Sequence, residues 1–102
     1  MPNIQHSVRL CRDIEDLIPT FLNNRRIEVS DLRRALEWEN FDHLSYLGNR
    51  MRGCGTPYGF DQVSMLGEDI FEAALSKNIE LLAKKINEYE SYLADVQVCF
   101  AD

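Results

Sequence analysis

Apolar residues recur at helical spacing along most of this chain. The clearest stripe is the last one, whose members follow one another at intervals of three and four positions: Ile79, Leu82, Ile86, Tyr89, Leu93 and Val96. Such spacing lines one face of an α-helix with apolar side chains. Asn78 stands just ahead of the stripe, where the N-cap of a helix is expected. The pattern therefore predicts a C-terminal helix that begins after Asn78.

Two further stripes predict helices in the middle of the chain. One opens after Asp61, closes near Ser76 and consists of Val63, Leu66, Ile70 and Ala73. The other has Asn40 as its expected N-cap and consists of Phe41, Leu44, Leu47, Met51 and Cys54. This second helix is expected to end in the segment 53–59, which holds three glycines and Pro57.

The first half of the chain has a less regular pattern. One apolar stripe covers residues 14–22 and another covers residues 29–36, with Arg25 and Arg26 between them. We interpret both as one long helix from about Asp13 to Glu39. Pro19 then falls in its first turns, where the missing N–H costs least. A break near Asn23 is the alternative.

Strand-like alternation of apolar and polar residues is nowhere sustained, so the sequence predicts an all-α protein. Four helices joined by short connections favour an antiparallel up-down four-helix bundle. We expect residues 1–11 to be an N-terminal extension and residues 12–102 to form the bundle. The expected core includes Leu47, Met51, Val63, Ile70, Ile86 and Leu93.

The composition narrows the class of protein. With 102 residues, the chain has the size of one domain, which excludes an enzyme with a cleft between two lobes. The proportions of 45% hydrophobic and 27% charged residues are typical of a soluble globular protein. No apolar run reaches the length of a membrane span, and the first ten residues lack the features of a secretory signal. We therefore expect a cytoplasmic protein without a membrane partner.

The net charge of −6 is concentrated in the second half of the chain. Residues 1–53 hold eight Arg and eight acidic residues, whereas residues 54–102 hold three Lys and nine acidic residues. A protein that binds the phosphate backbone of nucleic acid needs a basic face. Nucleic acid is therefore not an expected partner.

No pattern of metal ligands or catalytic carboxylates is present. Cys11, Cys54 and Cys99 include no C-x-x-C pair and have no His at ligand spacing, so we expect reduced, partly buried thiols and no metal or cofactor. Several other residues are expected to have structural roles. Arg25, Arg26, Arg33 and Arg34 should form a solvated, salt-bridged face, Tyr89 should lie in the core, and Gly67 should allow close helix packing.

The most unusual segment is LGNRMRGCGTPYGF, residues 47–60. On a helix with about 100° per residue, Asn49 lies about 160° from both Leu47 and Met51, so its side chain should point to solvent. Gly53 follows one turn later and leaves that face open to the backbone of another protein. Arg52 beside it supplies a fixed charge suited to a phosphate or a carboxylate.

This segment resembles the signature of the histidine-containing phosphotransfer domains of bacterial and fungal phosphorelays. The family signature is H-x-x-K-G, followed six residues after the glycine by another glycine and an apolar residue. The matching positions here are Asn49, Arg50, Met51, Arg52, Gly53, Gly59 and Phe60, and the resemblance extends over about residues 12–97. It implies a four-helix bundle that exchanges a phosphoryl group with receiver-domain aspartates.

The phosphoacceptor position is occupied by Asn49 instead of histidine. The lone pair of an amide nitrogen is delocalised into the carbonyl, so asparagine is not a nucleophile for phosphoryl transfer. His43 lies six residues earlier, on another face of the helix, where a capping or surface role is expected. His6 lies in the N-terminal extension and belongs to no recognisable site.

The resemblance thus implies a non-catalytic protein that binds the receiver domain of a response regulator or a hybrid histidine kinase. The residues expected to form the receiver-binding surface are Tyr46, Asn49, Arg50, Arg52, Gly53, Thr56 and Gly59. Two alternatives stay open. One is a structural or dimerising helical module without receiver binding, and the other is an active phosphotransfer protein that carries an engineered histidine-to-asparagine change.

Overall fold

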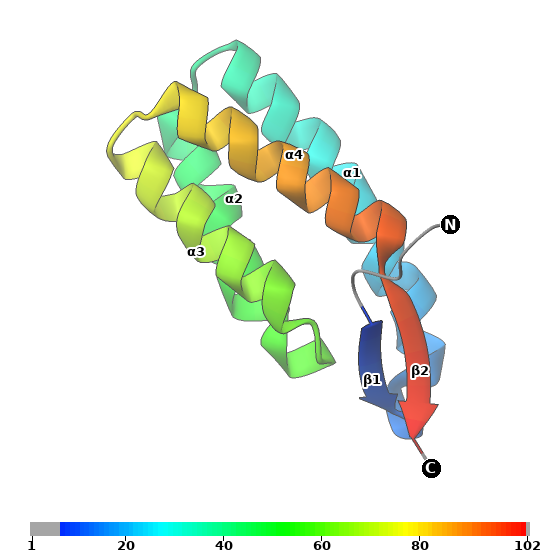
Figure 1. Ribbon diagram of the computed structural model, residues 1–102. Coiled ribbons are helices and arrows are strands. Elements are labelled where there is room, and N and C mark those ends of the chain that lie inside the picture. Colours follow the sequence, from blue (N-terminus) through cyan, green and yellow to red (C-terminus); the bar gives the residue numbers. More distant parts are fainter. Residues whose placement is uncertain (1–6, 102) are drawn as a thin grey trace.

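The computed structural model describes residues 7–101 (Figure 1). Helices make up most of this part of the chain. In chain order the elements are β1 (Ser7–Cys11), the 3-10 helix η1 (Arg12–Leu17), α1 (Ile18–Glu37), α2 (Phe41–Cys54), the 3-10 helix η2 (Thr56–Tyr58), α3 (Asp61–Leu75), α4 (Ile79–Asp95) and β2 (Gln97–Ala101). The predicted all-α class is therefore confirmed for the body of the protein, to which one small sheet is added.

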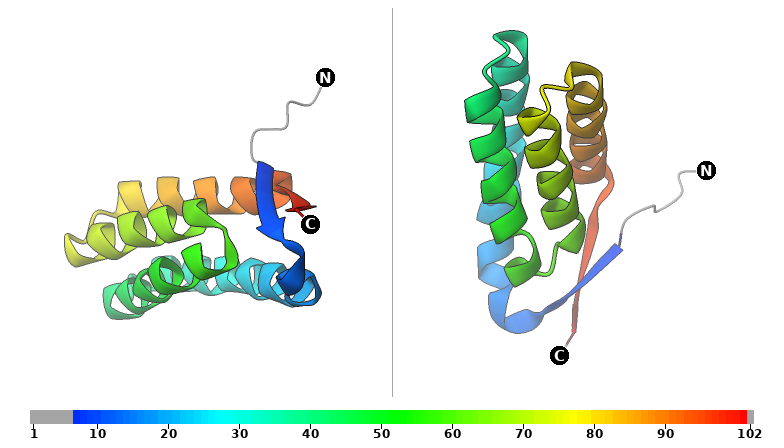
Figure 2. Two further views of the ribbon diagram at one scale, coloured as in Figure 1. Left: turned by 90° about the horizontal axis from the view of Figure 1, so that it is seen from below. Right: turned by 90° about the vertical axis from the view of Figure 1, so that its left-hand side faces the viewer.

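The four α-helices pack side by side (Figure 1). Each helix contacts the next one along the chain, and α4 also contacts α1. Figure 2 shows α2 and α3 lying close together along their length. None of the helices within residues 7–101 combines the length and apolar character that crossing a membrane requires.

Side-chain caps mark the N-termini of α2 and α4. The side-chain oxygen of Asn40 accepts a hydrogen bond from the backbone N–H of His43, at 3.1 Å, at the start of α2. The Asn78 oxygen accepts in the same way from Leu81, at 3.1 Å, at the start of α4. Each bond satisfies one of the N–H groups that have no partner within the first turn of a helix. Both predicted N-caps are confirmed.

The first helix differs from its prediction at the N-terminal end. Residues 12–17 form a 3-10 helix, and the α-helix begins only at Ile18, with Pro19 in its first turn. Proline lacks the N–H that a continuing α-helix would use, so the first turn is where it is best tolerated. The alternative break near Asn23 is wrong, because α1 runs without interruption to Glu37.

The predicted stripes meet in one apolar core. All six residues predicted for it are buried, and Tyr89 is fully buried among them. Gly67 lies where α3 packs tightly against α2, since a Cβ atom there would be 2.5 Å from the backbone nitrogen of Arg52. The predicted roles of Tyr89 and Gly67 are confirmed.

The two-stranded sheet was not predicted. Strand β1 lies in the segment expected to be an N-terminal extension, and it pairs in parallel with β2, Ser7 opposite Gln97 and Cys11 opposite Ala101. Figure 2 shows β2 continuing from the end of α4 beside β1. Five residues are too few for alternation to stand out, and the pairing joins opposite ends of the chain. Leu10 of β1 is 3% exposed and belongs to the core.

Candidate functional site

Helix α2 exposes the central residues of the predicted site along one side. Tyr46, Asn49, Arg52 and Gly53 are all exposed, whereas Leu47 and Met51 are buried beneath them. The predicted exposure of Asn49 is therefore confirmed. We refer to Tyr46, Asn49, Arg52 and Gly53 as the α2 polar face.

Asn49 and Arg52 contact each other on this face. The Nη2 group of Arg52 donates a hydrogen bond to Oδ1 of Asn49 at 2.5 Å. The guanidinium carbon of Arg52 also lies 5.1 Å from the ring centroid of Phe71 on α3, within the range of a cation–π interaction. The two contacts hold the Arg52 side chain over the boundary between α2 and α3.

Gly53 leaves the face open beside this pair. A Cβ atom added at Gly53 would have no neighbouring atom within 4 Å. Packing inside the protein therefore does not require a glycine here, although glycine in a helix costs about 1 kcal/mol relative to alanine. Close approach by another molecule is a function that would favour it.

Aromatic rings occupy the N-terminal part of the face. Tyr46 is 57% exposed and stacks on His43 with 6.0 Å between ring centroids. The guanidinium carbon of Arg50 lies 5.6 Å from the Tyr46 ring centroid. His43 therefore has a surface role near the helix start, as predicted.

The structure gives Thr56 and Gly59 local roles in the turn after α2. The backbone N–H of Thr56 donates to Oγ of Ser64 at 2.8 Å, and the Thr56 hydroxyl donates to the same oxygen at 3.1 Å. Gly59 has φ of 87°, in the left-handed region that favours glycine. A Cβ atom at Gly59 would lie 2.2 Å from Cδ2 of Leu10, so this glycine also makes room for β1.

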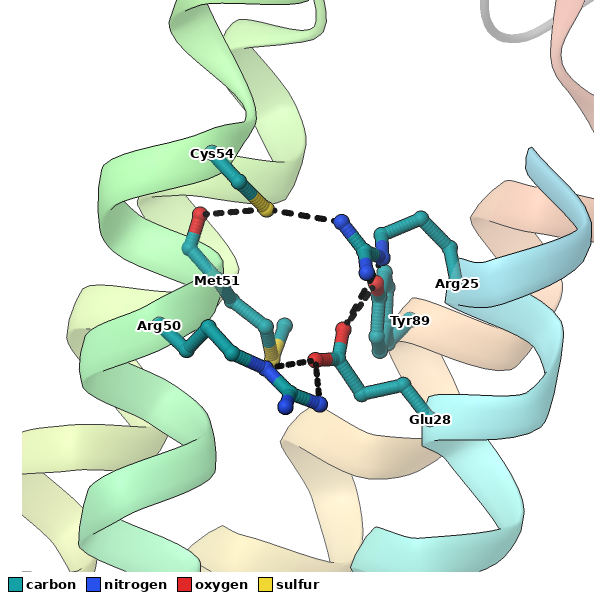
Figure 3. A network of polar contacts seen from close by, with 6 residues as sticks. All are labelled: Arg25, Glu28, Arg50, Met51, Cys54 and Tyr89. Carbon is teal, nitrogen blue, oxygen red and sulfur yellow. Dashed lines mark hydrogen bonds and ion pairs between the residues drawn. The ribbon is translucent and has the colours of Figure 1, made fainter. Parts of the chain in front are cut away.

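Arg50 belongs to a network, centred on the buried Glu28, that the sequence did not predict (Figure 3). The Nε and Nη2 groups of Arg50 donate to Oε2 of Glu28 at 3.2 and 2.9 Å. The other oxygen, Oε1, accepts from the Tyr89 hydroxyl at 2.9 Å and forms an ion pair with Arg25 at 3.2 Å. The Glu28 side chain is 0% exposed. A buried carboxylate with these partners joins α1, α2 and α4.

The network perturbs the acid–base properties of its members. Burial and the Glu28 carboxylate both raise the pKa of Tyr89, which keeps its hydroxyl protonated as a donor. The hydrogen bond to Glu28 raises the pKa of the Arg50 guanidinium. Burial raises the pKa of the Cys54 thiol, although Arg25, whose Nη1 group lies 2.8 Å from the sulfur, acts in the opposite direction.

The spacing of Glu28 from the apolar residues of α1 indicates that its side chain is buried. Glu28 lies seven residues after Phe21 and four before Leu32, both of which are buried. Two polar residues at the interruption of the apolar stripe, Arg25 and Glu28, therefore face the interior, whereas Arg26 is exposed. The prediction of a solvated arginine face is wrong for Arg25, whose side chain is only 12% exposed. Arg33 fits that prediction, because it is exposed and forms an ion pair, in its case with Glu90 on α4.

The described residues include no candidate metal site. Within residues 7–101, no group of three or more His, Cys, Asp or Glu side chains is arranged to hold a metal ion. Cys54 is a free thiol, and the side chains of Cys11 and Cys99 lie outside what the structure describes, as does His6. The α2 polar face presents hydrogen-bond donors and aromatic surface, which suit binding.

We compared the chain with family models, curated proteins and solved structures. None of them matches it.

Proposed function

We propose that this chain binds the receiver domain of a response regulator or a hybrid histidine kinase through the α2 polar face, without transferring a phosphoryl group. Its helices would then form the antiparallel up-down bundle of a histidine-containing phosphotransfer domain. The protein would act in the cytoplasm, as an adaptor or a competitor.

The open space at Gly53 is the observation that carries the proposal. It lies one turn after the exposed Asn49 and beside Arg52, in the register of the family signature. A receiver domain presents an acidic pocket around its aspartate, and a guanidinium next to a gap suits the approach of such a pocket. Binding is a property of this surface, whereas transfer requires a nucleophile that asparagine lacks.

Two substitutions test the surface. Gly53→Glu places bulk and negative charge in the gap, and Arg52→Glu reverses the charge that attracts an acidic pocket. Both positions are exposed, so the fold should be retained, which circular dichroism checks. We expect each variant to lose at least about tenfold in affinity for the cognate receiver, measured by calorimetry.

Lys84→Glu provides a matched control. Lys84 is exposed on α4, and its replacement changes the net charge by the same amount as Arg52→Glu. This control should bind as tightly as the parent. If Gly53→Glu and Arg52→Glu also do so, the α2 polar face is not the interface. If no receiver encoded in the same genome binds the parent, the receiver-binding function is wrong, and a structural or dimerising module becomes the better explanation.

A further inference from the structure

The hydrogen bond between Asn49 and Arg52 determines which groups the α2 polar face offers to a partner. A guanidinium can donate hydrogen bonds but cannot accept them. The atom of Asn49 that faces Arg52 must therefore be the oxygen, as the 2.5 Å contact from Nη2 to Oδ1 requires. The Asn49 amide nitrogen is left with its two N–H groups for a partner.

The Arg52 guanidinium also has donors to spare. Within residues 7–101, its only hydrogen bond is to Asn49, and no carboxylate lies within ion-pair distance. Arg50 differs, because its guanidinium pairs with the Glu28 carboxylate, which it shares with Arg25. The exposed pair of Asn49 and Arg52 thus presents donors and positive charge beside the gap at Gly53.

We infer that Asn49 and Arg52 bind the phosphoryl group on the receiver's aspartate, so that this chain prefers the phosphorylated receiver. The inference rests on the proposed function and adds that the chain distinguishes the phosphorylated receiver from the unphosphorylated one. A phosphoryl group supplies three acceptor oxygens and a charge close to −2, more of both than an aspartate carboxylate. No bond of the acyl phosphate breaks, because neither side chain is a nucleophile for it.

The position of the pair in α2 favours a phosphoryl group presented by a protein over free phosphate. Arg52 lies in the last turn of the helix, where the negative end of the helix dipole disfavours any anion, so additional contacts with the partner are needed. Contacts with Tyr46 and with the gap at Gly53 are available only to a larger partner. Free phosphate should therefore bind much more weakly than the phosphorylated receiver.

The test compares two forms of one receiver domain, unmodified and loaded with beryllofluoride as a stable mimic of the phosphoryl group. Calorimetry should show that the parent chain binds the loaded form at least about tenfold more tightly. Asn49→Asp keeps the side-chain shape but replaces the amide donors with a carboxylate, which pairs with Arg52 and repels the phosphoryl group. This variant should lose the preference.

Asn87→Asp is the matched control. Asn87 on α4 also accepts a hydrogen bond from an arginine, from Nη2 of Arg33 at 3.0 Å, but it lies outside the α2 polar face. This control should keep the parent's preference for the loaded form. A general effect of added negative charge would lower the preference in both variants and would overturn the inference.

The remaining outcomes separate the two proposals. Equal affinity of the parent for both forms overturns the preference but leaves receiver binding in place. Binding to neither form overturns receiver binding itself. Inorganic phosphate is titrated separately while the Asn49 side-chain amide is followed by NMR. Saturation at micromolar phosphate would identify a site for free anions and would overturn the assignment to a phosphoryl group presented by the receiver.

Discussion

Gly48 of α2 and Gly67 of α3 face each other where these two helices are tightly packed. A Cβ atom on Gly48 would lie 2.8 Å from the carbonyl oxygen of Gly67, and one on Gly67 would lie 2.7 Å from the carbonyl oxygen of Gly48. Both distances are too short for a carbon atom against backbone, which cannot move aside as a side chain can. The contact between Gly48 and Gly67 thus fixes the backbone of α2, which carries Asn49, against α3.

Gly67→Ala should therefore destabilise the fold, by about 2–3 kcal/mol, because the added methyl group forces α2 and α3 apart. Gly53→Ala is the internal control, since its methyl group meets open space. The control should stabilise the protein by about 0.5–1 kcal/mol through helix propensity. Urea unfolding measures both values, and a Gly67→Ala variant as stable as the parent would contradict the close helix contact.

Glu28→Gln should be among the most destabilising conservative changes in this chain. The neutral amide leaves Arg25, whose side chain is only 12% exposed, without its counter-charge and weakens the bonds to Arg50 and Tyr89. Breaking a buried ion pair in this way costs about 3–5 kcal/mol. Urea unfolding at neutral pH gives the change in the free energy of unfolding.

Glu90→Gln is the control for that measurement. Glu90 pairs with Arg33 at the surface, where the two side chains are 60% and 41% exposed. Exposed pairs contribute at most about 1 kcal/mol, so this variant should remain close to the parent. Equal losses for Glu28→Gln and Glu90→Gln would mean that the carboxylate of Glu28 is not buried in the folded protein.

We expect the free energy of unfolding to fall at alkaline pH because Tyr89 and Tyr92 are buried. Burial, with a smaller contribution from Asp61, raises the pKa of Tyr92 to about 12, whereas a tyrosine in the unfolded chain has a pKa of about 10. Between these values the unfolded state has released a proton that the folded state retains, so the free energy of unfolding falls as pH rises. Tyr89 acts in the same direction, since its pKa is also raised.

Tyr92→Phe should make that fall less steep, because the variant has one fewer group that titrates differently in the two states. The free energy of unfolding is measured by urea at several pH values from 9 to about 12, the range set by these pKa values. Tyr46→Phe serves as the control, since this ring is 57% exposed. A fall of equal slope in parent and Tyr92→Phe would show that Tyr92 ionises as readily in the folded protein as in the unfolded chain.

The parts of the fold that the sequence predicted depend on local relationships. Asn40 and Asn78 each bond to a backbone N–H three residues later, and the apolar stripes repeat within a single helix. The exposure of Asn49 follows from its angular distance to Leu47 and Met51, which is also local. Spacing along the chain is sufficient to determine such features.

The features that were missed depend on contacts between distant parts of the chain. Strand β1 pairs with β2 at the opposite end of the sequence, and Gly59 is required partly because Leu10 packs against it. Glu28 is buried because Arg50 and Tyr89, from two other helices, supply its hydrogen bonds. A polar residue within an apolar stripe indicates that partners exist, but the stripe does not identify them.

The remaining prediction concerns the nucleophile. Asn49→His places an imidazole on the α2 polar face, beside Arg52 and one turn before the open Gly53. The neighbouring guanidinium disfavours the protonated ring, which keeps a ring-nitrogen lone pair available for attack on phosphorus. The parent should take no phosphate from its phosphorylated receiver. The Asn49→His variant should acquire a radioactive label that is labile in acid and stable in alkali, as phosphohistidine is.

Asn87→His controls for a histidine placed on an exposed helix outside the α2 polar face, and it should remain unlabelled. Labelling of the parent at His43 would contradict the assignment of this chain as a protein without phosphotransfer. If the Asn49→His variant binds the receiver but stays unlabelled, the imidazole is displaced from the line of attack. Displacements of about 1 Å lower the rate of such a reaction about a hundredfold, whereas a binding surface tolerates them. Transfer at Asn49→His but not at Asn87→His would therefore show that the geometry for in-line attack is retained where the nucleophile is absent.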